Sequence, residues 1–187
     1  LRITGPIFED VVTARAFLPE ELTGEYRRTF LCVKAHHTDE AAAALVRHLA
    51  SDGHVVSAQN GLNERSIARI AGERRVVGCF VNFGADYLEP GVVHYGGRGT
   101  VVIGEIDGRL SDRARAIHEL MTSLEPKAVL TGNIWGFLWG KMIYGALLFG
   151  TALTDDSIAD VLDDPAARPV LRRLALEVAT IAAASGV

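Results

Sequence analysis

The chain has 187 residues, of which 49% are hydrophobic and 22% are charged, and 19 Lys and Arg against 23 Asp and Glu give a net charge of −4. This composition indicates a folded globular protein of one large or two small domains and excludes a disordered chain. The slight acidity also argues against a general nucleic-acid-binding protein, which needs Lys and Arg gathered on one face.

The amino-terminal part of the sequence alternates short apolar runs with helical patterns. Residues 1–4 and 11–16 are expected to form strands, and the continuous apolar run over 29–33 predicts a third strand that is buried on both faces. A helix is expected to follow, with Thr38 as its N-cap residue and its end near Ala50.

Two further strands are predicted over 54–58 and 75–82. The helix between them, over 62–71, is expected to end at Gly72, because glycine readily adopts the conformation that closes a helix. Strands that alternate with helices in this way are typical of parallel βαβ units.

The glycine-rich segment 96–99 is expected to turn the chain between two antiparallel strands, 91–95 and 100–105. From Ser111 onwards the apolar residues recur with a period of 3.6, which predicts a helix. Residues 128–130 are expected to form a short last strand.

The sequence changes character after Thr131 and is helical from there on. Residues 134–153 are twenty residues with a single charge, Lys141, and are long enough to cross a bilayer. A lysine at the centre of a membrane span costs about 2.5–3.5 kcal/mol, so we interpret the segment as a buried helix of a soluble protein and keep a membrane-associated helical protein as a rival hypothesis. Two more helices are expected, over 157–162 and after a cap at Asp164.

These patterns predict an α/β fold in which a parallel Rossmann-type sheet, without its first βαβ unit, is followed by the start of an all-helical domain. The first domain is expected over 1–131 and the second over 132–187, within a longer protein. Cys32 and Cys79 lie in apolar runs and form no CxxC pair, so both are expected to be buried thiols. No secretory signal opens the sequence, which points to the cytoplasm.

Two polar clusters follow consecutive strands of the predicted sheet, Lys34-Ala35-His36-His37 after the first and Gln59-Asn60-Gly61 after the second. Ligands of open parallel sheets bind beyond the carboxyl ends of the strands, so we expect these clusters to line one crevice. Lys34 would offer a positive charge to a phosphate or carboxylate, and Asn60 both a donor and an acceptor. Simpler alternatives stay open, because a lysine at a strand end is commonly solvated and Asn-Gly is a frequent turn pair.

Lys141 is the third candidate, since it is the one charge in a nearly continuous apolar helix. Its side chain either extends to the surface along the helix or faces a cleft. In a cleft, desolvation would lower the pKa of the ammonium towards the range that suits a general acid.

Other chemistry is poorly supported by the sequence. The adjacent residues His36 and His37 are expected to point apart, and no third ligand stands at a spacing typical of a metal site. Asp155-Asp156 and Asp163-Asp164 are interpreted as helix caps rather than a catalytic carboxylate pair. No nucleophile triad is found.

Read together, these segments resemble the ketopantoate reductase (2-dehydropantoate 2-reductase) family over nearly the whole chain. The Gln-Asn-Gly turn and the Trp-x-Lys pair are the most specific parts of the resemblance. The segments, in order, are Val33-Lys34-Ala35, Gln59-Asn60-Gly61-Leu62, Val76-Val77-Gly78, Glu89-Pro90-Gly91-Val92-Val93 with Ile103-Gly104-Glu105, and Leu138-Trp139-Gly140-Lys141.

The resemblance implies a Rossmann domain for NADPH, a helical substrate and dimerisation domain, and an active site between them, used to reduce ketopantoate on the route to pantothenate. It implies that Lys141 donates a proton to the carbonyl oxygen as hydride arrives. It further implies that Asn60 lies near the nicotinamide and the substrate, and that Lys34 reaches the cofactor. The expected partners are a small 2-keto acid and a second copy of the chain, with no nucleic acid, membrane or metal.

Three departures from the family pattern matter. The Gly-x-Gly-x-x-Gly turn for the pyrophosphate would lie before Leu1, and the later substrate-binding helices would lie after Val187, so this piece alone is expected to be inactive. At Gly145, one turn after Lys141, the family usually has a substrate-binding asparagine. The change points to a related 2-keto acid as substrate, or to a family member that binds nucleotide as a sensor or partner protein.

Overall fold

The structure is a computed structural model that describes residues 1–187 and divides into two compact units, Leu1–Ile134 and Trp135–Val187. The first unit contains a five-stranded sheet in the order β3-β4-β5-β8-β9. Strands β3, β4 and β5 are parallel, β8 runs antiparallel to β5, and β9 is parallel to β8. The strands are Tyr26–Leu31, Leu49–Ser57, Val76–Asn82, Thr100–Glu105 and Val129–Leu130.

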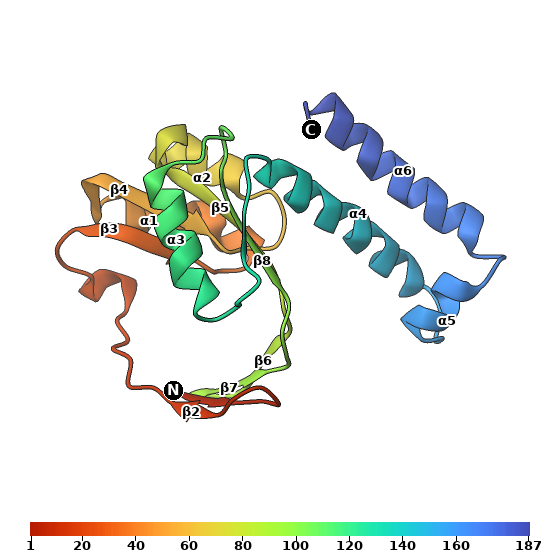
Figure 1. Ribbon diagram of the computed structural model, residues 1–187, viewed down its shortest axis with the longest axis horizontal. Coiled ribbons are helices and arrows are strands. Elements are labelled where there is room, and N and C mark those ends of the chain that lie inside the picture. The colour runs from red at the N-terminus through yellow and green to blue at the C-terminus, as the bar shows by residue number, and fades with distance from the viewer. The chain divides into compact units, whose positions relative to one another are not determined.

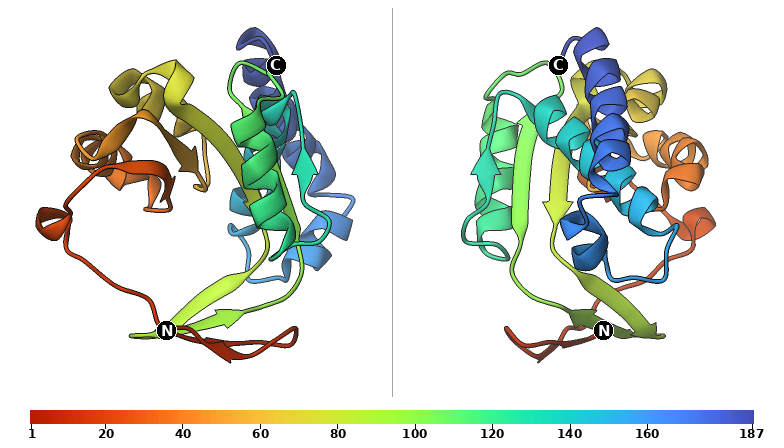
Figure 2. Two further views of the ribbon diagram at one scale, coloured as in Figure 1. Left: turned by 60° about the vertical axis from the view of Figure 1, so that its left-hand side comes forward. Right: turned by 90° about the vertical axis from the view of Figure 1, so that its right-hand side faces the viewer.

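Helices cover both faces of this sheet (Figures 1 and 2). Helices α1 (Thr38–Val46) and α2 (Glu64–Ala71) lie on one face, and α3 (Asp112–Thr122) lies on the other. Adjacent residues of β4 therefore serve different cores: Val55 packs on the side of α1 and α2, and Val56 on the side of α3. This alternation explains the continuous apolar runs of the sequence and confirms the predicted α/β fold class.

A second, four-stranded sheet has the order β2-β1-β7-β6. Strands β1 and β7 are parallel, and β6 pairs antiparallel with β7. The predicted strand over 11–16 is wrong in extent, because β2 ends at Val11, whose side chain is 75% exposed and has no apolar cover. The strands are Arg2–Thr4 (β1), Asp10–Val11 (β2), Ala85–Glu89 (β6) and Val92–Tyr95 (β7).

The predicted pairing of 91–95 with 100–105 is also wrong. Strand β7 belongs to the four-stranded sheet and β8 to the five-stranded one, so the glycine segment 96–99 carries one arm of a long hairpin from sheet to sheet (Figure 1). The opposite arm, β5 followed by β6, runs alongside, and a Cβ on Gly99 would lie 2.1 Å from the carbonyl oxygen of Asn82. The glycines therefore permit a close approach of the two arms rather than a reversal of the chain.

Three further expectations need correction. Strand β3 is not buried on both faces: it forms the sheet edge, where Phe30 is 38% exposed. Thr38 is a helical residue rather than the N-cap, and α1 ends at Val46 because the chain enters β4 at Leu49. Cys79 is buried as expected, but Cys32 is exposed, since it follows the edge strand.

The second unit contains α4 (Ile134–Thr151), α5 (Ile158–Asp163) and α6 (Arg168–Ala184). Asp164 does not cap α6, which begins four residues later with a proline in its first turn. Helices α4 and α6 approach closely at Gly150, where an added Cβ would lie 2.9 Å from Leu174 Cδ1. None of the helices combines the length and apolar character needed to cross a bilayer.

Candidate functional site

The loops after β3 and β4 lie together at the carboxyl edge of the parallel strands. The backbone N–H of Ala58 donates to the carbonyl of Leu31 over 3.1 Å. The side-chain amide of Gln59 donates to the carbonyl of Val33 over 2.6 Å and to Thr38 Oγ1 over 2.9 Å. Gln59 thus ties the second loop to the first loop and to the start of α1, which the sequence had not indicated for this residue.

Both predicted binding residues of this edge are exposed. Lys34 stands just before a short 3-10 helix, Ala35–His37, and Asn60 stands next to the buried Gln59. The carbonyl of Asn60 accepts a hydrogen bond of 2.8 Å from Asn63 Nδ2, which closes the turn and leaves the Asn60 side chain exposed. The structure thus places an ammonium and an amide on neighbouring loops, and their binding roles stay predictions.

The histidines of the first loop do not point apart as expected. The ring centroids of His36 and His37 are 4.1 Å apart at an interplanar angle of 52°. Both residues lie in the 3-10 helix Ala35–His37, and their rings are in contact there. No group of three or more His, Cys, Asp and Glu side chains is placed to hold a metal ion.

Buried polar side chains flank Asn60 in the loop between β4 and α2. Ser57, at the end of β4, and Glu64, the first residue of α2, are both fully buried, and Gln59 is 6% exposed. Neither Glu64 carboxylate oxygen, nor Ser57 Oγ, nor Gln59 Oε1 has a hydrogen-bond partner of ordinary geometry.

Burial raises the pKa of Glu64 to about 7, against the opposing effects of the backbone at Glu64 and of the Ser57 hydroxyl. Sequence reasoning missed Glu64, because a glutamate in the first turn of a helix is usually solvated there.

Lys141 and Gly145 belong to the second unit, one helical turn apart on α4. Lys141 is half-buried, and this burial lowers the pKa of its ammonium. Leu138 and Trp139, which precede it on α4, are buried at 2% and 7% exposure, whereas Met142 is 38% exposed, so Lys141 stands at the border of the buried face of the helix. A Cβ built on Gly145 would have no atom within 4 Å, so the position has room for a side chain.

The groups of each unit have their own chemistry. A partly desolvated ammonium can give up a proton more readily than a solvated one. The exposed ammonium and amide at the strand ends suit a ligand that carries anionic and hydrogen-bonding groups.

Comparisons with a family model and with curated proteins indicate the same family. The family model described as ketopantoate reductase PanE/ApbA matches residues 1–108. A 2-dehydropantoate 2-reductase of Archaeoglobus fulgidus is 32% identical over 151 residues, which is 80% of this chain and 50% of the relative.

Two solved structures share the fold. The crystal structure of 2-dehydropantoate 2-reductase from Geobacter metallireducens has a TM-score of 0.83 at 24% identity and covers 97% of this chain and 62% of its own. A D-mandelate dehydrogenase solved with NADH and anilino(oxo)acetate has a TM-score of 0.81 at 18% identity and covers 100% of this chain and 61% of its own. The chain spans between 38% and 64% of the length of the curated relatives it matches.

Proposed function

Because this chain belongs to the ketopantoate reductase family, we propose that its protein reduces ketopantoate, or a related 2-keto acid, to the 2-hydroxy acid with NADPH. Pantothenate synthesis in the cytoplasm is the setting that we propose for this reaction. The observation that carries the proposal is the half-buried Lys141 of α4, whose ammonium has a lowered pKa.

The residues at the carboxyl edge of β3 and β4 fit a nucleotide cofactor. Lys34 offers an exposed cation and Asn60 an exposed amide, on two loops that Gln59 holds together. NADPH, when bound, supplies the hydride. We propose that Lys34 contacts the cofactor and that Asn60 orients the reacting end of the cofactor and the keto acid.

We propose Lys141 as the general acid. Hydride addition to a 2-keto group places negative charge on the carbonyl oxygen, and a positioned ammonium both stabilises that charge and delivers the proton. The product is then the neutral 2-hydroxyl group, and the lysine is left as the free amine until it regains a proton. The first unit would hold the cofactor and the helices from 132 onwards would hold the substrate.

The test replaces Lys141 with alanine in the full-length protein. Turnover of ketopantoate should fall by about 10²- to 10⁴-fold, the usual contribution of a general acid, while NADPH binding, measured by its fluorescence, should be unchanged. Lys127→Ala removes an exposed lysine of the first unit and is the matched control. Full activity of Lys141→Ala would refute the assigned role.

Gly145 supports a second candidate function, a family member that binds nucleotide but acts as a sensor or partner protein. The position lacks any side chain that could hold a substrate, and it has open space around it. A screen of 2-keto acids with NADPH separates the two candidates. Tight NADPH binding without oxidation by any keto acid would favour the sensor.

We also propose that the helical unit forms a homodimer. Apolar side chains stand exposed near the end of α4, with Phe149 at 83% and Leu153 at 84% exposure, and exposed apolar clusters commonly mark interfaces. Light scattering of the full-length protein should give twice the mass of one chain, and a monomeric mass would contradict the proposal.

A further inference from the structure

The face of the larger sheet that carries α1 and α2 bears a row of three small residues. Val55 of β4 and Val76 of β5 pack into the core beneath these helices. Ser57 and Gly78 follow them by two residues on the same strands, so they lie on the same face. Gly78 is the register partner of Ser57 on β4 and of Gly104 on β8. The row therefore crosses three neighbouring strands, and little side-chain volume fills the space above it.

Ile134, the first residue of α4 and the last of the first unit, occupies this space. Its side chain is fully buried. A Cβ added to Gly78 would lie 2.6 Å from Ile134 Cγ1, and one added to Gly104 would lie 3.0 Å from Ile134 Cβ. Both distances are shorter than the separation of about 3.5–4.0 Å at which carbon atoms pack. The start of α4 can therefore come this close to the sheet only because both positions are glycine.

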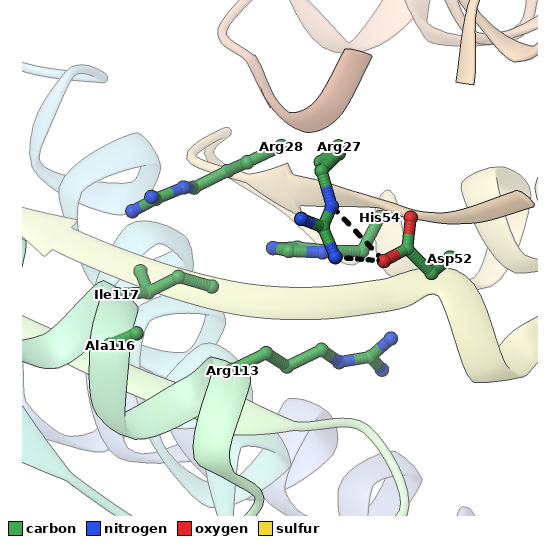
Figure 3. A pocket seen from close by; sticks show the side chains of 7 residues that line it. All are labelled: Arg27, Arg28, Asp52, His54, Arg113, Ala116 and Ile117. Carbon is green, nitrogen blue, oxygen red and sulfur yellow. Dashed lines mark hydrogen bonds and ion pairs between the residues drawn. The ribbon is translucent and has the colours of Figure 1, made fainter. Parts of the chain in front are cut away.

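The opposite face of the sheet is filled differently. Figure 3 shows the long side chains of Arg28, His54 and Arg113 in the space between β3, β4 and α3. Long side chains have several rotatable bonds and can adjust to a small shift of the helix beside them. A short side chain that is packed directly against two glycine backbones has no such freedom. The position of α4 at Ile134 is therefore closely defined by its contacts with the first unit.

Lys141 follows Ile134 on the same helix. The seven residues from one to the other make two helical turns, so both side chains leave α4 on the same side, about 10 Å apart along its axis. Leu138, which lies between them on that side, is 2% exposed. The side of α4 that is held at Ile134 is therefore the side that carries Lys141.

From this arrangement we propose that Ile134 is a positioning residue for Lys141: packed on Gly78 and Gly104, it fixes the first turn of α4 and thereby the place of the ammonium two turns later. The inference rests on the proposed function, in which Lys141 is the general acid. A proton donor must stand within hydrogen-bond reach of the oxygen that it protonates. A misplacement of about 1 Å can lower the rate about a hundredfold. Ile134 acts through the helix and not by contact with the substrate.

The first measurement is the pKa of Lys141 in the full-length protein, followed by NMR of isotope-labelled lysine side chains, with Lys141→Arg to identify the signal. Burial lowers this pKa below the 10.5 of an ordinary lysine. Ile134→Ala should weaken the contact between the start of α4 and the sheet and admit water to the ammonium, so the pKa should rise towards 10.5. Ile117→Ala is the matched control, because it removes an isoleucine of α3 that is 1% exposed, and it should leave the pKa of Lys141 unchanged.

The second measurement is the turnover of ketopantoate. In Ile134→Ala, kcat should fall about tenfold or more, whereas the affinity for NADPH, measured by its fluorescence, should stay that of the wild type. Ile134→Val removes a single carbon, and it should show the same changes to a smaller extent if the alanine variant does not fold. Gly78→Ala should also lower kcat, because the added methyl group displaces Ile134. Combining Gly78→Ala with Ile134→Ala returns one methyl group to the space and should give a higher kcat than either single change.

The two measurements separate this inference from the proposed function. An unchanged pKa of Lys141 in Ile134→Ala would overturn the inference, whatever the effect on kcat. An equal rise of this pKa in Ile117→Ala would overturn it too, because a general loss of stability would then explain the result. If the wild type reduces no keto acid while the pKa of Lys141 rises in the Ile134 variants alone, the proposed function fails and the positioning of Lys141 by Ile134 stands.

Discussion

Replacing Glu64 with glutamine should stabilise the protein, and the gain should depend on pH. Glu64 is fully buried at the start of α2, and neither of its carboxylate oxygens receives a hydrogen bond of ordinary geometry. An ionised carboxylate in this position has lost its water without full compensation. Glutamine keeps nearly the same shape and can form no charge, so it removes this cost.

The magnitude follows from the pKa. Burial raises the pKa of Glu64 from 4.5 to about 7, and each pKa unit corresponds to about 1.4 kcal/mol. Below pH 4.5 both folded and unfolded chains hold the proton, and nothing is lost. Between pH 4.5 and 7 the unfolded chain ionises first, so stability falls as the pH rises. Above pH 7 the loss is complete and amounts to about 3 kcal/mol.

The assay is urea unfolding of the full-length protein and of Glu64→Gln at pH 4.5, 6.5 and 8.5. The difference in unfolding free energy between the two proteins should grow by about 3 kcal/mol across this range. Glu73→Gln removes an exposed glutamate just after α2 and should show no such trend. A difference for Glu64→Gln that is the same at all three pH values would refute the reasoning.

Three further predictions concern the candidate site. Gln59→Leu leaves the Val33 carbonyl and Thr38 Oγ1 without their donor, so unfolding experiments should show a loss of about 1–3 kcal/mol. The general-acid role of Lys141 predicts that kcat/KM falls as the pH rises, with a midpoint below the 10.5 of an ordinary lysine, and a midpoint at or above 10.5 would contradict that role. Gly145→Asn, which has open space for its side chain, should lower the KM for ketopantoate if the natural substrate is a related keto acid, and an unchanged KM would count against this explanation.

The alternation of strands and helices could be predicted because the central strands β4 and β5 of the larger sheet are covered on both faces. Val76 and Val77 of β5, like Val55 and Val56 of β4, pack into opposite cores, and such strands are written in the sequence as uninterrupted apolar runs. The same rule fails at β3, where Phe30 belongs to an equally apolar run but stands at the sheet edge. The residue types show that a segment is apolar, but they do not show how many strands and helices pack against it.

The second sheet was hidden for a different reason. Strand β6 carries only exposed side chains, including Tyr87 at 69% exposure, so no alternation of apolar and polar residues marks it. The glycines of 96–99 predict a turn from the sequence alone, because glycine is equally compatible with a reversal of the chain and with two backbones in close contact. The distinction depends on which strands pair, and pairing over long distances in the sequence leaves no local signal.

Some residues of the candidate site could be predicted from the sequence and others could not. The positions of Lys34 and Asn60 at strand ends follow from the order of strands and helices, so the sequence could predict their neighbourhood. The roles of Gln59 and Glu64 depend on side chains that turn inward, against the usual behaviour of Gln next to Asn-Gly and of Glu in a first helical turn. The residue type of a polar side chain does not show whether tertiary packing buries it, so the sequence alone cannot distinguish a buried glutamine or glutamate from a solvated one.

The buried polar groups beneath the loop connect its stability to its proposed function. A loop that presents Asn60 to a ligand must hold one conformation, and Asn60 itself is exposed. Gln59 provides two hydrogen bonds that fix it from one side. Glu64, with Ser57, closes the other end of the loop with groups that cost stability when ionised. Ionisation of Glu64 above pH 7 is therefore expected to destabilise both the Asn60 loop and the fold. The affinity for the cofactor and the free energy of unfolding should then fall over the same pH range.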